Sequence, residues 1–297
     1  MTKTLRQTWL AAQAALTDSL NLDASEARVD AQLLLQTTLK VNKAWLLAHA
    51  SDALQANNHA DFQALLTRRL TGEPIAYILG YREFYGLNLM VTSDTLIPRP
   101  DTETLVAAAL AKIQNKASES VLDLGTGTGA IALAIAKNRP QAFITAVDAS
   151  MAALDIAKKN AQNLNITNIQ FVLSDWFESL NNQNNAVEKF DVIVSNPPYI
   201  EQGDVHLSQG DLRFEPISAL ASGMDGLDDI RRIIDNSLIY LKPQGWLMLE
   251  HGYNQAEAVA YLMAEVGLLN IESFKDLGGN QRVTQAKNPL IVSTHWD

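Results

Sequence analysis

Cysteine is absent from this sequence, and histidine is scarce. Five histidines are scattered over 297 residues, and no two of them have the spacing of paired metal ligands. A chain without thiols can form neither a disulfide nor a thiolate metal site. Isolated imidazoles also argue against a zinc centre. We therefore expect a protein that binds no metal.

Positive charge is in short supply as well. The chain has 23 Lys and Arg against 33 Asp and Glu, a formal net charge of -10. Affinity for nucleic-acid backbones comes mostly from Lys and Arg, so stable nucleic-acid binding is not expected, although a local basic patch stays open.

Long apolar runs are missing too. No run approaches the roughly 20 residues that span a bilayer. The apolar stretch Trp9 to Leu16 is interrupted by Gln13 and favours an amphipathic helix over a signal peptide. A mitochondrial transit segment is the less supported alternative. We expect no membrane association and a cytoplasmic location.

The first part of the chain has helical periodicity only. Ser25 is a plausible N-cap for one helix, and Phe62, Leu66 and Leu70 have helical spacing in another. We predict a small helical domain over residues 1–74. From 75 to 95 the β-prone residues surround Gly86, which indicates a β-hairpin that links two domains, or alternatively an extended linker.

Beyond this point, strand and helix patterns alternate through the rest of the chain. Such a rhythm is typical of an α/β, Rossmann-like, doubly wound sheet, here over residues 96–297. The strands are expected at 120–124, 141–148, 169–174, 190–195, 245–250, 269–274 and 290–295.

A glycine-rich turn follows the first of these strands. It reads Asp123-Leu124-Gly125-Thr126-Gly127-Thr128-Gly129 and opens a helix. Glycines let the backbone turn tightly and let a ligand approach, and a helix start offers free N–H groups. Asp148, at the end of the second strand, is placed to accept hydrogen bonds from ribose hydroxyls. A tight turn without a ligand, or a site for NAD or FAD, has the same pattern. The Gly-x-Gly-x-Gly spacing and the second motif below favour S-adenosylmethionine (SAM).

Asp175 and Trp176 end the third strand, beside the expected adenine pocket. Asp175 is placed to accept from an exocyclic amine, and Trp176 to pack against the ring. The alternative is a capping Asp and a core Trp.

The fourth strand ends in Asn196-Pro197-Pro198-Tyr199. Two prolines remove two N–H donors and leave carbonyl oxygens exposed. The Asn196 side-chain oxygen and the Pro197 carbonyl can then accept both hydrogens of one planar NH2 group, and Tyr199 offers a flat face. An amide or aromatic NH2 is a poor nucleophile because its lone pair is delocalised, so a site that orients it is needed. The pattern predicts methyl transfer to an sp2 NH2 nitrogen; a plain Pro-Pro turn is the alternative.

Together the two motifs resemble the amino-group methyltransferases. One branch acts on adenine N6 in nucleic acid and the other on a glutamine amide in protein. Four further segments are similar to the release factor glutamine methyltransferases of the HemK or PrmC family. These are Leu-Ile-Pro-Arg-Pro-Asp-Thr-Glu at 96–103, Gly-Glu-Pro-Ile-Ala-Tyr at 72–77, Arg-Glu-Phe at 82–84 and Arg-Phe-Glu-Pro at 213–216.

This resemblance implies a seven-stranded sheet with a reversed final strand, SAM as the methyl donor, and a class 1 peptide chain release factor as the protein substrate. The glutamine of its Gly-Gly-Gln motif would be methylated on the side-chain nitrogen, which would modulate translation termination. SAM would be bound by residues that match Gly125 to Gly129, Asp148, Trp176 and Asn196, and the amide by Asn196 to Tyr199. The helical domain would help to dock the factor. The open alternatives are an adenine N6 methyltransferase and a non-catalytic binding module with this fold.

Several charged residues are weaker candidates. Arg213 and Glu215, in the long loop after the catalytic motif, are candidates for substrate binding or form a solvated ion pair. Arg99 and Glu103 flank a helix start and are cap residues or ligands. His251 is expected to be structural.

Overall fold

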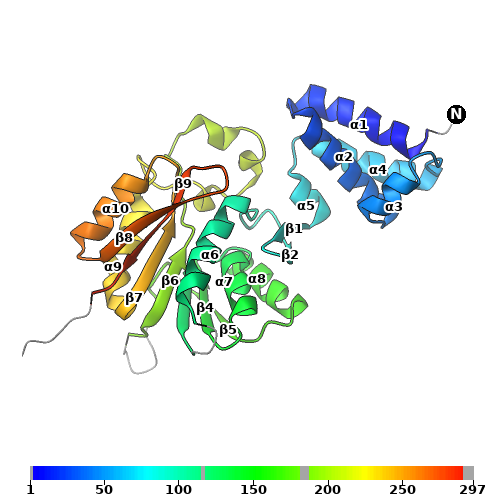
Figure 1. Cartoon of the computed structure of the whole chain (residues 1–297). Coiled ribbons are helices and arrows are strands. Elements are labelled where there is room, and N and C mark those ends of the chain that lie inside the picture. Colours follow the sequence, from blue (N-terminus) through cyan, green and yellow to red (C-terminus); the bar gives the residue numbers. More distant parts are fainter. Residues whose placement is uncertain (1–2, 115–117, 181–186, 290–297) are drawn as a thin grey trace, which may run out of the picture. The chain divides into compact units, whose positions relative to one another are not determined.

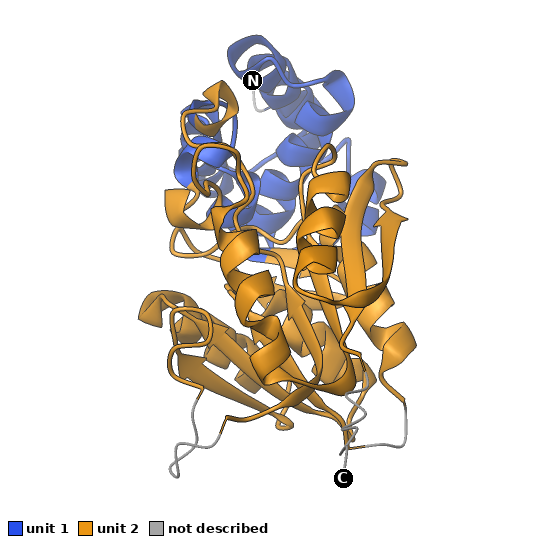
Figure 2. Cartoon of the chain, turned by 90° about the vertical axis from the view of Figure 1, so that its left-hand side faces the viewer, with its two compact units in different colours: residues 1–81, 208–214 blue, residues 82–207, 215–297 orange. Residues whose placement is uncertain are grey.

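The computed structural model describes residues 3–114, 118–180 and 187–289. The chain divides into two compact units. Unit 1 contains residues 1–81 and 208–214, and unit 2 contains residues 82–207 and 215–297 (Figure 2). Each unit has its own hydrophobic core, so each is described by itself. Seven residues of a distant loop, 208–214, belong to unit 1.

Unit 1 is helical in its described part. Its helices are α1 (Leu5–Leu20), α2 (Ala24–Leu39), α3 (Lys43–Ala48), α4 (Ala56–Leu70) and α5 (Ile75–Leu79). Helix α2 begins earlier than predicted, because Asp23 and not Ser25 is its N-cap. The Asp23 carboxylate accepts from the backbone N–H groups of Ser25 and Glu26. A carboxylate at this position satisfies orphan N–H donors and favours the positive end of the helix dipole.

The core of unit 1 is apolar, with one ion pair at its edge. Trp9, Leu16, Leu34 and Phe62 are nearly or fully buried in it. Arg69 of α4 is also buried and pairs with Asp30 of α2 at 2.7 Å. Burying two charges is tolerated when they satisfy each other.

The hairpin consists of β1 (Tyr81–Phe84) and β2 (Leu87–Met90), which form a two-stranded sheet (Figure 1). The prediction that β structure begins at Ile75 was wrong, since Ile75–Leu79 is helix α5. Pro74 stands at the N-cap of this helix, and Gly80, at φ 80°, ends it. A proline just before a helix lacks only an N–H that would be unpaired anyway, so it starts the turn well.

Unit 2 contains a seven-stranded sheet in its described part. The strands are β3 (Ser120–Leu124), β4 (Phe143–Asp148), β5 (Ile169–Leu173), β6 (Phe190–Ser195), β7 (Leu241–Glu250), β8 (Leu269–Lys275) and β9 (Gln281–Lys287). Their order is β5-β4-β3-β6-β7-β9-β8. Neighbours from β5 to β7 are parallel, and β9 runs antiparallel between β7 and β8. The predicted α/β sheet with a reversed final strand is confirmed.

The strand expected at 290–295 lies outside the described residues. The final described strand is β9, which was not predicted. Its sequence, Gln-Arg-Val-Thr-Gln-Ala-Lys, is mostly polar. Even so, Val283, Thr284, Gln285 and Ala286 are buried, because the helices on both faces of the sheet cover this central strand. Hydropathy alone hides such a strand, since its burial comes from helices that pack on it.

Helices cover both faces of the sheet (Figure 1). They are α6 (Glu103–Lys112), α7 (Ala130–Asn138), α8 (Met151–Asn163), α9 (Asp228–Tyr240) and α10 (Ala256–Glu265), with 3₁₀ turns at Pro100–Thr102, Val205–Ser208, Leu212–Phe214 and Ile217–Ala219. Alternate residues of β3 belong to different cores. Val121 packs with the α6 and α7 side chains, and Leu122 with those of α9 and α10.

Because the chain leaves β3 toward β4 on one side and β6 lies on the other, the strand order switches at β3. A crevice at the carboxyl ends of the strands is expected there. Within the described ranges, no helix is both long and apolar enough to cross a membrane.

Candidate active site

A cavity of about 580 Å³ lies at the carboxyl ends of β3, β4, β5 and β6, within unit 2. Small-molecule sites commonly occupy roughly 300–1,000 Å³. The lining includes Gly125, Gly127, Asp148, Trp176 and Asn196, which come from four different strand ends. The fold thus brings together residues of the glycine loop, the second strand, the third strand and the Asn-Pro-Pro-Tyr motif.

The glycine loop turns from β3 into α7 with backbone angles that favour glycine. Gly125 and Gly127 have φ values of 70° and 54°, and both line the cavity. A Cβ on Gly125 would lie 3.3 Å from the ring of Trp176. The other loop residues face inward: Thr126 and Thr128 are buried, and Gly129 packs closely on α7 and α8. The backbone of the two cavity-lining glycines is therefore the surface offered to a ligand.

Asp123 lies beneath this loop and does not line the cavity. Its Oδ2 accepts from the Thr126 hydroxyl at 2.6 Å and from the Ala132 N–H at 3.2 Å. Complete burial raises the pKa of its carboxyl to about 7. Asp123 ties β3 to the start of α7, so its placement gives it a supporting position behind the glycines.

Asp148 ends β4 and faces the cavity. One carboxylate oxygen accepts from the Gly127 N–H and the other from the Ser150 N–H, each at 2.8 Å. Burial raises its pKa, and these two hydrogen bonds lower it in part. Each oxygen keeps a lone pair after these bonds, so the carboxylate can still accept from ligand hydroxyls.

Asp175 and Trp176 also line the cavity, but their side chains have different surroundings. Both Asp175 oxygens lie 2.9 Å from Arg232, on an exposed edge. The Trp176 ring lies against Gly125, and its Nε1 donates to Asp229 at 3.1 Å. Its φ of 48° is unusual for a large residue, so the backbone is held in a costly conformation that aims the ring.

The cavity is acidic. Asp94, Asp148, Asp175 and Asp229 line it, and no Lys, Arg or His does within the described parts of the chain. Asp175 is neutralised by Arg232, whereas Asp94 and Asp148 form no ion pair with the described residues. A cationic ligand such as a sulfonium is favoured there, and a phosphate group is not.

The Asn-Pro-Pro-Tyr motif follows β6. Asn196 and Pro198 line the cavity, while Pro197 is buried and Tyr199 lies outside the lining. The Asn196 Nδ2 donates to the Thr102 hydroxyl at 3.2 Å. The Tyr199 hydroxyl donates to Glu250 at 3.2 Å, and its carbonyl accepts from Gln255. Asn196 is therefore held through its donor end, and its Oδ1 accepts nothing from the described residues.

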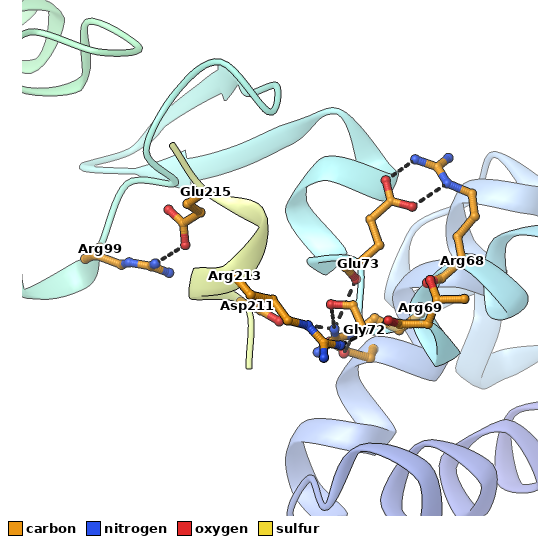
Figure 3. A network of polar contacts seen from close by, with 10 residues as sticks. Arg68, Arg69, Gly72, Glu73, Arg99, Asp211, Arg213 and Glu215 are labelled. Carbon is orange, nitrogen blue, oxygen red and sulfur yellow. Dashed lines mark hydrogen bonds and ion pairs between the residues drawn. The ribbon is translucent and has the colours of Figure 1, made fainter. Parts of the chain in front are cut away.

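The expected alternative of an ion pair between Arg213 and Glu215 was wrong. Glu215 is buried in unit 2, where it accepts from the Ile97 N–H at 2.9 Å and pairs with Arg99 (Figure 3). Arg213 belongs to unit 1 and donates to the Thr71 carbonyl at 3.0 Å. Side chains two residues apart thus serve different units, which spacing along the loop does not reveal.

Glu103 and His251 have structural partners. The Glu103 carboxylate accepts from the Tyr85 N–H at 3.1 Å. Both His251 ring nitrogens have partners, Gly252 O at 2.9 Å and Thr284 Oγ1 at 2.8 Å. Burial lowers the pKa of His251, so the ring stays neutral.

Four residues near the site were not found from the sequence: Asp94, Thr102, Asp229 and Glu250. Of these, only Glu250 carried a signal, since an acid at the carboxyl end of a parallel strand points toward the crevice. The other three come from loops or helix starts that only the fold places there.

Family models match most of the chain. A model described as "Methyltransferase domain" matches residues 115–287, and one described as "PrmC N-terminal domain" matches residues 11–80. The release factor glutamine methyltransferase of Xylella fastidiosa strain 9a5c is 48% identical over 88% of this chain and 94% of its own length. The protein of the same name from Escherichia coli K12 is 47% identical over 89% of this chain and 93% of its own.

A solved structure shares the fold. A methyltransferase from Pyrococcus furiosus superposes with a TM-score of 0.50 at 16% identity, covering 75% of this chain and 98% of that one. At this identity the likeness supports the fold alone.

Proposed function

Because the chain belongs to the release factor glutamine methyltransferase family, we propose that it methylates the side-chain nitrogen of the Gly-Gly-Gln glutamine in class 1 peptide chain release factors. SAM is the methyl donor. When bound, SAM supplies a methyl group on a positively charged sulfur. The carbon–sulfur bond breaks as the carbon–nitrogen bond forms, and S-adenosylhomocysteine and one amide proton are released. The product carries the methyl group on the amide nitrogen and modulates translation termination.

The cavity fits this donor. The Gly125 and Gly127 backbone leaves room that a Cβ would fill, the Asp148 carboxylate accepts from ribose hydroxyls, and Trp176 packs on the adenine. Asp94 and Asp148, which line the cavity and form no ion pair with the described residues, suit a cationic sulfonium. Thr126, Thr128 and Gly129 hold the loop from inside, and Asp123 supports it.

Asn196 orients the substrate amide. Its Oδ1 accepts one N–H of the glutamine, and the Pro197 carbonyl accepts the other, so that the nitrogen lone pair faces the methyl group. Asn196 has no basic nitrogen and does not remove the proton. The site therefore acts by orientation, which is worth several kcal/mol when the reacting atoms are aligned, up to ~7–11. Pro198 and Tyr199 keep this turn rigid.

The observation that carries the proposal is that the side-chain NH2 group of Asn196 donates a hydrogen bond to the Thr102 hydroxyl. Only the acceptor end remains for a ligand, and a primary amide needs an acceptor. Adenine also presents an NH2 group, but it would arrive with phosphates at an acidic opening.

The partner is then a class 1 release factor, with the helical region over residues 1–74 as its docking domain, 75–95 as a linking hairpin and 96–297 as the catalytic domain. In substrate binding, Arg213 contacts the factor, whereas the buried Glu215 acts indirectly by holding its loop to Ile97 and Arg99. Since translation takes place in the cytoplasm, we place the protein there.

The test is methyl transfer from labelled SAM to a purified class 1 release factor. Its Gln→Ala variant at the Gly-Gly-Gln motif and a DNA duplex serve as controls. We expect label on the wild-type factor alone. Label on DNA would support adenine methylation. Tight SAM binding without transfer to any acceptor would support a binding module.

A further inference from the structure

Two residues without an assigned role meet beside the Asn-Pro-Pro-Tyr motif. Glu250 is the last residue of β7 and Thr102 the last of the turn before α6, and both side chains are almost completely buried. Strand β7 pairs with β6 so that Leu249 stands opposite Ser195. The next residues, Glu250 and Asn196, therefore lie at the same sheet edge.

One hydrogen bond joins each of these residues to the Asn-Pro-Pro-Tyr motif. Asn196 Nδ2 donates to Thr102 Oγ1 at 3.2 Å, and the Tyr199 hydroxyl donates to Glu250 Oε1 at 3.2 Å. The nearby Thr102 hydroxyl favours the charged form of Glu250 and lowers the pKa of its carboxyl, although Glu250 Oε2 has no hydrogen-bond partner among the described residues. Burial raises the pKa of Tyr199, so its hydroxyl keeps the proton that it donates.

A hydroxyl has one hydrogen, and this limits the geometry. If the Thr102 hydrogen goes to Glu250, the Thr102 oxygen can only accept. An asparagine amide is nearly symmetric in shape, so its orientation is decided by its hydrogen-bond partners. The Thr102 oxygen then selects the NH2 end of Asn196.

The helix does not need the Thr102 hydroxyl. Thr102 stands at the N-cap of α6 but makes no side-chain capping bond. Its hydroxyl instead contacts Asn196. Removing it should disturb the site more than the helix.

We propose that Thr102 and Glu250 are positioning residues for methyl transfer: the buried Glu250 carboxylate takes the Thr102 and Tyr199 hydrogens, and Thr102 thereby turns the Asn196 Oδ1 toward the substrate amide. This inference rests on the proposed function, because it assigns Oδ1 an N–H partner. It predicts that the carboxylate form of Glu250 is the active form. A protonated Glu250 would itself donate a hydrogen and could no longer accept the hydrogens of Thr102 and Tyr199.

The charges around Glu250 fit such a switch in protonation. Burial raises the pKa of its carboxyl to about 7, against the effects of Thr102, Tyr199 and Arg282, while Asp101 raises it further. Arg282 is itself held by Asp276 at 3.1 Å and Asp101 at 3.3 Å. These groups face Glu250 from the turn before α6, from the Asn-Pro-Pro-Tyr motif and from β9.

The first experiment compares Thr102→Val with Thr102→Ser. The valine variant should lower kcat roughly tenfold, the effect of one lost hydrogen bond in the transition state, and leave the SAM Kd within about twofold. Serine keeps a hydroxyl and should restore most of kcat. The matched control is Thr145→Val in β4, a buried threonine whose hydroxyl accepts from the Gln170 amide at 2.9 Å. This control should lose comparable stability and keep kcat.

A wild-type kcat in Thr102→Val would overturn the inference, as would a loss that serine does not repair. Should the valine variant fail to fold, Glu250→Gln decides the question through its pH profile. Wild-type kcat should fall as pH drops below about 7, and this limb should vanish in Glu250→Gln. An unchanged limb would contradict the role of Glu250.

A spectroscopic measurement separates this inference from the proposed function. The side-chain amide hydrogens of Asn196, followed by NMR without substrate, should exchange faster in Thr102→Val than in the wild type. Equal exchange rates would overturn the positioning role even if the release factor is methylated. Faster exchange in a chain that methylates no factor would support the positioning role and contradict the proposed function.

Discussion

Buried carboxylates differ in their partners: Asp30 of unit 1 and Glu215 and Asp276 of unit 2 each have a cationic partner, whereas two others of unit 2 have none among the described residues. In unit 1, Asp30 has a direct cationic partner, since Arg69 lies 2.7 Å away and also bonds the carbonyls of Gly72 and Glu73 and the side chain of Asp211 (Figure 3). In unit 2, Asp123 and Glu250 are buried without an ion pair at hydrogen-bond distance, and burial raises the pKa of each to about 7. A buried ion pair stays charged and holds elements together, whereas a buried carboxyl without a cationic partner takes up a proton more readily.

The largest expected effect comes from removing the buried ion pair of unit 1. Asp30→Ala leaves the buried Arg69 with only the partly exposed Asp211 as a carboxylate partner and should destabilise unit 1 by about 3–5 kcal/mol. Denaturant unfolding followed by the fluorescence of Trp9, which lies in this core, measures the loss. An Asp30→Leu, Arg69→Met double variant removes both charges and should recover much of it. A single variant as stable as wild type would show that water reaches Arg69.

The next effect concerns the catalytic side. Asn196→Ala removes the acceptor that orients the amide and should lower kcat by roughly 10²–10³-fold, as loss of a preorganised transition-state partner does. SAM affinity, measured by calorimetry, should stay within about threefold. Asn138→Ala, at an exposed asparagine that bonds a carbonyl of its own helix, is the control and should keep full activity. Near-normal turnover in Asn196→Ala would contradict the mechanism.

The unpaired carboxylate of Asp123 should make stability depend on pH. Its pKa is about 7 in the folded protein, whereas the ordinary value for an aspartate is 3.8, so the folded state binds the extra proton between these values. Stability is then fully present below about 3.8 and falls as pH rises through 7, by about 2 kcal/mol between pH 5 and 7. Urea unfolding at several pH values measures the slope. In Asp123→Asn, the loss of unfolding free energy between pH 5 and 7 should be smaller by about 2 kcal/mol. An identical loss in both proteins would mean that Asp123 is ionised throughout this range.

The smallest expected effect is on the cofactor. Asp148→Ala removes a charged acceptor for ribose hydroxyls and should weaken SAM binding roughly tenfold, the lower end for a charge-assisted hydrogen bond. At saturating SAM, the turnover of this variant should be within a fewfold of the wild-type value. Calorimetry gives the affinity directly, and an unchanged Kd would remove the ribose assignment.

The sequence determined the class of the fold and most of the cavity. Alternating strand and helix patterns, the glycine turn and the Asn-Pro-Pro-Tyr motif are local features, because glycine and proline act on their own backbone and strand ends meet at one edge of a parallel sheet. The resemblance to the family added the substrate.

Only the tertiary structure decided the partners of the polar side chains. Glu215 pairs with Arg99, 116 residues earlier, and Thr102 holds Asn196, 94 residues later. The polar strand β9 is buried because it pairs with β7 and β8 inside the sheet and helices cover both faces there. Local patterns reflect the conformation of a residue and its immediate neighbours, whereas hydrogen-bond direction and burial depend on groups that folding brings from far along the chain.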